Sequence, residues 1–232
     1  MSPFDRIVVE LGPTAYAEPY VGGSFLKMPA NALVNVIYPA VGIYWLTRAR
    51  GCSPSLRPIV RAFGGAAVVY GFVQFTRIVT QTRAAAVLDQ WATLPFFALV
   101  VGAAMVLRGA TTGAVTLLVL ASVLSYGAAL FHPSGFDVVL GAHIVAAVAA
   151  CVLTLRMGAS LPWLILAVLA CSGFVLLKVG DHWLAAHGAI FSRLTGHFWS
   201  KICDALQIHF VLCFFVSATA PRDESPAQAA VR

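Results

Sequence analysis

Long apolar runs separated by short polar breaks dominate the hydropathy pattern of this 232-residue chain. A helix needs about 20 predominantly apolar residues to cross the hydrocarbon core of a bilayer. Gly, Pro, Ser and charged residues fill the breaks, as is typical of loops. The pattern therefore predicts an all-α integral membrane protein, a seven-transmembrane-helix bundle. We expect one membrane helix in each of residues 30–47, 61–80, 88–107, 111–131, 137–155, 161–180 and 194–218.

This division leaves three regions. Residues 1–29 form a polar N-terminal segment with no apolar stretch of signal-peptide length. Residues 30–218 form the seven-helix membrane domain. The polar tail, residues 219–232, is expected to be disordered and cytosolic.

Orientation follows from the first loop, which carries four arginines, Arg48, Arg50, Arg57 and Arg61. Loops rich in Lys and Arg remain in the cytosol. We therefore expect the N-terminus to be lumenal or outside and the C-terminus to be cytosolic.

Composition excludes a soluble domain, since only 10% of the residues are charged, against about 25% in soluble domains. The net charge of +6 comes from basic residues scattered as loop anchors, so membrane lipid rather than nucleic acid is the expected partner. The five cysteines lack paired spacing and are expected to pack as small core residues. Several runs are near the minimum spanning length, which favours a thin endomembrane such as that of the Golgi.

Ionisable residues interrupt the last apolar run, "LTGHFWSKICDALQIHF". Such residues are costly inside a bilayer and suggest a functional site by default. At 100° per residue, His197, Lys201 and Asp204 fall on one arc of the helix, and apolar residues occupy most of the remainder. We expect this polar stripe to face the interior of the bundle.

Other runs supply polar partners for this stripe. Pairing Asp89 with Lys201 or Arg77 would remove net charge from the interior. Alternatively, Arg77 reaches the lipid headgroups, and Asp181 with His182 lies in the interface. We expect one polar cluster near one end of the bundle, with Asp89, His197, Lys201, Asp204, Gln74, Arg77, Asp181 and His182 as its candidate members.

Two kinds of chemistry fit these residue types. A metal site needs converging His and carboxylate ligands, and His197 and Lys201 have the i, i+4 spacing of a shared helix face. A lysine ammonium cannot bind zinc unless it is deprotonated, which weakens this interpretation. A proton or ion relay would instead use Asp, His and Lys in series.

Several longer motifs resemble the transmembrane protein 187 family, an uncharacterised multi-pass family. They include "RAAAVLDQW", "HPSGF", "LGAHIVAAV" and "LTGHFWSKICD". The resemblance extends from about Tyr16 to Phe215. Members of that family begin with an additional apolar segment that this sequence lacks, so we expect a shorter product or an alternative start.

A more distant likeness is to alkaline ceramidases and progestin and adipoQ receptors, seven-helix proteins that include metal-dependent lipid hydrolases. "AEPYVGGSFLKMPANALVN", "LDQ" and "HFWSK" resemble three of their motifs, and Asp89 and His197 match residue for residue. The expected serine and first histidine fall near Gln74 and Ile78, and the second histidine of the last helix is Lys201. The resemblance thus implies no zinc and no other cofactor, with the Lys201 charge standing where a metal would sit.

These observations favour a multi-pass protein of unknown activity that is a non-catalytic relative of such hydrolases. A lipid-binding, receptor-like or trafficking role follows, without assigned catalytic residues. One alternative is a lipid amidase or esterase that uses His197 and Asp89 with His182 or Asp181. Another is a small transporter, although the sequence shows no inverted repeat.

Overall fold

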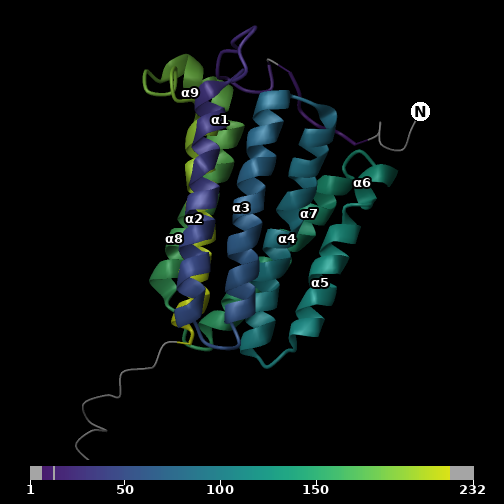
Figure 1. The fold of residues 1–232 in the computed structure, drawn as a ribbon, viewed down its shortest axis with the longest axis vertical. Coiled ribbons are helices and arrows are strands. Elements are labelled where there is room, and N and C mark those ends of the chain that lie inside the picture. Colours follow the sequence, from purple (N-terminus) through teal and green to yellow (C-terminus); the bar gives the residue numbers. More distant parts are fainter. Residues whose placement is uncertain (1–6, 13, 220–232) are drawn as a thin grey trace, which may run out of the picture.

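The computed structural model describes residues 7–12 and 14–219, and the regular structure in this part of the chain is entirely helical. The helices stand side by side along a common axis (Figure 1). Their bounds are α1 Pro29–Leu33, η2 Val34–Val36, α2 Ile37–Arg48, η3 Ala49–Gly51, α3 Arg57–Thr80, α4 Arg83–Leu107, α5 Thr112–Ser125, α6 Ala128–Phe131, α7 Gly135–Leu155, α8 Leu161–Val179, α9 Asp181–His187 and α10 Gly196–Ser217.

Six helical stretches of the described chain are long and apolar enough to cross a membrane. They are Arg57–Thr80, Arg83–Leu107, Thr112–Phe131, Gly135–Leu155, Leu161–Val179 and Gly196–Ser217. The expectation of an integral membrane helical protein is confirmed at this level. Each stretch overlaps one of the runs expected from hydropathy.

The remaining expected span, residues 30–47, is not one regular helix. α2 has only 12 residues, and the tighter turn η2 separates it from α1, although the three elements form a continuous rod (Figure 1). The Asn35 side chain donates hydrogen bonds to the carbonyls of Asn31, at 2.8 Å, and Ala32, at 3.3 Å. Pro39 lacks the N–H that would bond to the carbonyl of residue 35. Both features disturb regular α-helical bonding at this point.

The helices pack around the interior as neighbouring pairs. α2 packs on α3, α3 on α4, α4 on α7, and α8 on α10, while α5 covers the outer side of α4. α3 and α4 are joined by residues 81–82, with Gln81 in the left-handed conformation at φ 52°. The turn makes the two helices antiparallel neighbours, so Arg77 and Asp89 lie at the same level. We call this end of the bundle the site end.

The N-terminal segment is less polar in the structure than its composition suggests. Ile7, Tyr16 and Met28 are buried, and residues 7–12 and 14–28 lie at the site end without regular structure. The carboxylate of Glu18 accepts the backbone N–H groups of Ala30 and Asn31, both at 2.7 Å. These bonds satisfy free donors at the start of α1. Of the expected tail, residues 220–232 lie outside the described residues.

Glycines allow α2 and α3 to approach closely. A Cβ added to Gly64 would lie 2.9 Å from the carbonyl oxygen of Gly42, and one added to Gly71 would lie 2.4 Å from Cδ of Pro39. Small residues at such contacts let helix backbones pack closely in lipid. This contact holds the α1–α2 rod against the bundle.

Substituting Gly64 tests this contact. We expect Gly64→Ala to lower the free energy of unfolding by about 1–3 kcal/mol, because the new methyl group overpacks the helix pair. Gly65→Ala is the matched control, since nothing lies within 4 Å of its added Cβ. Thermal unfolding in detergent, followed by size-exclusion chromatography, measures both. Equal midpoints for the two variants would contradict the close contact.

Candidate functional site

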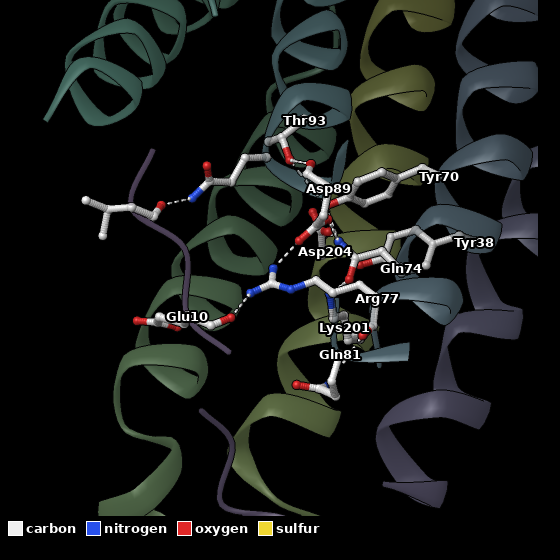
Figure 2. A network of polar contacts seen from close by, with 12 residues as sticks. Glu10, Tyr38, Tyr70, Gln74, Arg77, Gln81, Asp89, Thr93, Lys201 and Asp204 are labelled. Atoms are coloured by element: carbon white, nitrogen blue, oxygen red, sulfur yellow. Dashed lines mark hydrogen bonds and ion pairs between the residues drawn. The ribbon is translucent and has the colours of Figure 1, made fainter. Parts of the chain in front are cut away.

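Asp89 lies at the centre of a buried polar network. Its side chain projects from α4, and the residue is 4% exposed. One carboxylate oxygen forms an ion pair with the Arg77 guanidinium, and the other accepts a hydrogen bond from the Gln74 amide. Both partners come from α3, one turn apart. The aspartate thus receives two donors from a single helix face (Figure 2).

Gln74 connects Asp89 to the last helix. The Lys201 ammonium donates to its amide oxygen, while its amide nitrogen donates to Asp89 and, at 2.5 Å, to the hydroxyl of Tyr70. Lys201 is 3% exposed. The pairing of Lys201 with Asp89 expected from the sequence therefore runs through an amide, and the direct ion pair is with Arg77.

Tyrosine and threonine hydroxyls extend the network. Tyr38 of the α1–α2 rod donates to Asp204 at 2.6 Å, and Tyr70 and Thr93 share a hydrogen bond at 3.3 Å. Thr93 also donates to the carbonyl of Asp89 at 3.0 Å. The α1–α2 rod, α3, α4 and α10 are thereby linked through polar side chains.

The N-terminal segment covers the network on one side. Arg77 donates to the carbonyl of Glu10 at 3.5 Å, and Gln90 donates to the carbonyl of Val8 at 2.9 Å. Figure 2 shows this segment running beside the guanidinium end of Arg77, where Glu10 lies. The segment therefore contributes main-chain acceptors to a site otherwise built from membrane helices.

The formal charges of the network cancel. Arg77 and Lys201 supply two positive charges, and Asp89 and Asp204 supply two negative charges. An isolated charge is expensive in a low-dielectric environment, whereas a neutral, hydrogen-bonded group of charges is much less so. The balance explains how four ionisable groups coexist within the membrane domain.

A cavity of about 470 Å³ adjoins the network. Aromatic and aliphatic side chains from α3, α4, α7, α8 and α10 form most of its wall, including Phe63, Phe96, Phe136, Phe174 and Val211. Five of the eight candidate residues line it, namely Gln74, Arg77, Asp89, Lys201 and Asp204. The cavity is thus apolar along its wall and charged where it meets the network.

The other three candidate residues line a neighbouring cavity, together with Arg77. Asp181 accepts the backbone N–H of His197 at 2.7 Å and that of Ala17 at 2.8 Å, which ties α10 to the N-terminal segment. The His197 ring contacts the edge of Tyr16, with centroids 4.4 Å apart. His182 is exposed. The structure therefore divides the expected single cluster between two adjoining cavities.

Sequence reasoning missed the tyrosines and the N-terminal segment. Tyr38 and Tyr70 sit in apolar runs, where a tyrosine is usually a packing residue with a polar tip. Their spacing along the chain carries no sign of their partners. Glu10 and Tyr16 fall in a segment without periodicity, so nothing in the sequence placed them at the site.

The donor set does not suit zinc. Among the described residues, no group of three or more His, Cys, Asp and Glu side chains is placed to hold a metal ion. Asp89 is already bound by Arg77 and Gln74, and the Lys201 ammonium donates to Gln74. His197 and Asp89 moreover line different cavities. We derive no metal chemistry from this arrangement.

Replacing Gln74 tests the network. We expect Gln74→Leu to lower the unfolding midpoint by at least about 5 °C, because it leaves the buried Lys201 ammonium without its hydrogen-bond acceptor. Gln207→Leu is the matched control, since Gln207 lines the same cavity but bonds to none of the four charged groups. Thermal unfolding in one detergent compares them. An unchanged midpoint for Gln74→Leu would contradict the bridging role.

Comparison with known proteins finds a matching family and similar relatives. The family model of the TMEM187 protein family matches residues 1–216. Human transmembrane protein 187 is 47% identical over 217 residues, which cover 91% of this chain and 83% of the human protein. The bovine protein is 45% identical over 227 residues, covering 92% and 88% respectively. No solved structure matches the chain. The chain is a multi-pass membrane protein and belongs to the transmembrane protein 187 family.

Proposed function

We propose that this protein binds an amphipathic lipid inside its helix bundle, in a non-catalytic, receptor-like or trafficking role. The observation that carries the proposal is the cavity of about 470 Å³, which is apolar along its wall and charged where it meets the network. Small-molecule sites commonly have volumes of about 300–1,000 Å³ with a few polar groups that fix orientation. A hydrocarbon chain suits the wall, and a polar head suits the charged end.

Access from the bilayer supports this proposal. Ile144 of α7 and Val175 of α8 line the cavity and are nevertheless 40% and 47% exposed. α7 packs on α4 and α8 on α10, while the two consecutive helices are not closely packed against each other. The cavity therefore reaches the lipid-facing surface between α7 and α8. A lipid could enter there without crossing the headgroup region.

The geometry favours binding over the rearranged hydrolase. A site that uses His197 and Asp89 together requires both side chains to face one substrate bond. The two residues line different cavities, and Asp89 is held by Arg77 and Gln74. The charged residues instead lie at one end of an apolar cavity, where they could position a polar head.

Narrowing the opening tests lipid binding. We expect Ile144→Trp to reduce photolabelling of the full-length protein by a radiolabelled, diazirine-bearing single-chain lipid at least about fivefold, since a larger side chain blocks the gap between α7 and α8. Val145→Trp is the matched control, because Val145 is 70% exposed and does not line the cavity. Equal labelling of both variants, or wild-type labelling that excess unlabelled lipid fails to displace, would contradict the proposal.

We also propose that the α1–α2 rod crosses the membrane as the seventh span. Residues 29–48 would cover roughly 30 Å at 1.5 Å per residue, and the rod lies along α3 (Figure 1). The end opposite the site carries Arg48, Arg50, Arg57, Arg61, Arg108 and Arg156, and no Asp or Glu among the described residues lies there. The positive-inside rule then favours a cytosolic location for this end and a lumenal or outside location for the site end.

The length of the spans supports an endomembrane location. α8 has 19 residues, or about 28 Å of helix. This length is close to the hydrocarbon thickness of roughly 27 Å in thin internal membranes.

Glycosylation mapping tests the crossing number. We expect Asn-X-Ser sequons to be glycosylated when they are added at the N-terminus or in the loop at Ser192, because both would face the lumen. Sequons inserted at Gly109 or after the C-terminus should remain unmodified. The readout is a mobility shift that a glycosidase removes. Modification at both termini would show an even number of crossings and contradict the seventh span.

A further inference from the structure

The second cavity lies between the N-terminal segment and the end of α8, at the site end of the bundle. Its volume is about 850 Å³. It shares five lining residues with the cavity beside the Asp89 network: Glu10, Arg77, Phe174, Val175 and Lys178. The two cavities therefore adjoin, and the charged residues Glu10, Arg77 and Lys178 line both of them.

Three residues that line this cavity carry a buried polar atom without a partner. His197 Nε2, the hydroxyl of Tyr16 and Nε of Arg77 have no hydrogen-bond partner among the described residues. These residues are only 3%, 4% and 8% exposed. Buried polar groups are nearly always hydrogen-bonded, so such a group calls for an explanation. Three of them in residues around one cavity indicate a polar ligand.

The donor character of these groups is clear for Tyr16. Burial raises the pKa of Tyr16 to about 12, so its hydroxyl stays protonated at neutral pH and can donate. Lys178 adds an ammonium that contacts the ring of Phe174 at 5.6 Å and forms no ion pair within the described chain. His182 also lines the cavity.

Carboxylates near the cavity leave these donors unsatisfied. Both oxygens of Asp181 already accept backbone N–H groups, from His197 and Ala17. The Glu10 side chain is exposed at the rim. Neither carboxylate pairs with the Lys178 ammonium or the Tyr16 hydroxyl within the described chain.

We propose that the second cavity binds an oxyanion head group, a phosphate or a carboxylate, on a single-chain amphiphile. The head contacts Lys178, Tyr16, His197 and Arg77. The hydrocarbon chain passes the shared residues Phe174 and Val175 into the cavity beside the Asp89 network. This inference rests on the proposed lipid-binding function and specifies the class of its ligand. Hydrogen bonds to charged groups are stronger than those between neutral groups. The head group, rather than the hydrocarbon chain, therefore determines which lipids bind.

A panel of single-chain lipids tests the head group. The full-length protein in phosphatidylcholine nanodiscs is titrated with lysophosphatidic acid, oleic acid, monoolein and sphingosine, and binding is followed by native mass spectrometry. We expect at least one of the two oxyanions to bind about tenfold more tightly than neutral monoolein and cationic sphingosine. The comparison of lysophosphatidic acid with oleic acid separates phosphate from carboxylate.

Variants separate the site from general surface charge. We expect Lys178→Gln to weaken oxyanion binding about tenfold and Tyr16→Phe to weaken it about threefold, with monoolein binding unchanged in both. Arg193→Gln is the control, because Arg193 is an exposed cation at the same end that lines neither cavity.

The outcomes distinguish this inference from the proposed function. Equal binding of monoolein and the oxyanions would overturn the oxyanion site and leave lipid binding intact. An equal loss in Lys178→Gln and Arg193→Gln would also overturn it, since the preference would then reflect the membrane surface. If none of the four lipids bound, both the inference and the proposed function would fail.

Discussion

The cost of an unpaired charge in hydrocarbon is the constraint on which this structure depends. Arg77, Asp89, Lys201 and Asp204 come from three membrane helices, and none would be stable alone at its depth. They form a neutral set in which Gln74 joins Asp89 to Lys201. The helices α3, α4 and α10 are consequently fixed relative to one another at the site end.

The membrane environment also shapes the cavity. Lipid and protein interiors are about equally apolar, so the hydrophobic effect does little to close a gap between membrane helices. α7 packs against α4, and α8 packs against α10. Between these two pairs lies a space lined by Phe136, Ile144 and Phe174. The polar network marks one end of that space. The N-terminal segment, tied down by Asp181 and Glu18, covers it.

Much of this scaffold could be predicted from the sequence, because length and hydropathy decide which segments can cross a bilayer. Six of the seven expected spans match helices of sufficient length, and the polar stripe of the last helix does place His197 and Lys201 in the interior. Helical periodicity alone explains that success. The remaining expected span is interrupted by a 3₁₀ turn, where the Asn35 side chain donates to the backbone carbonyl of Asn31. Hydropathy carries no information about such local hydrogen bonds.

The composition of the site could be predicted only in part. Charge balance led to the expectation that Asp89 meets a cation, and both Arg77 and Lys201 belong to its network. Asp181 and His197 line the second cavity, and Asp181 accepts the backbone N–H of His197. Such a side-chain to main-chain contact between distant segments has no signature in residue spacing. The same holds for Tyr16, which lies in a segment without regular structure.

A double-mutant cycle on the Arg77–Asp89 pair tests the central claim, that mutual pairing holds these charges inside the bundle. Arg77→Met, Asp89→Asn and the double variant are compared by reversible unfolding in mixed detergent. Each single change leaves one buried charge without its counter-ion, whereas the double change removes both. We expect the double variant to lose less unfolding free energy than the two single variants lose in sum, by at least about 2 kcal/mol. Additive effects would contradict it.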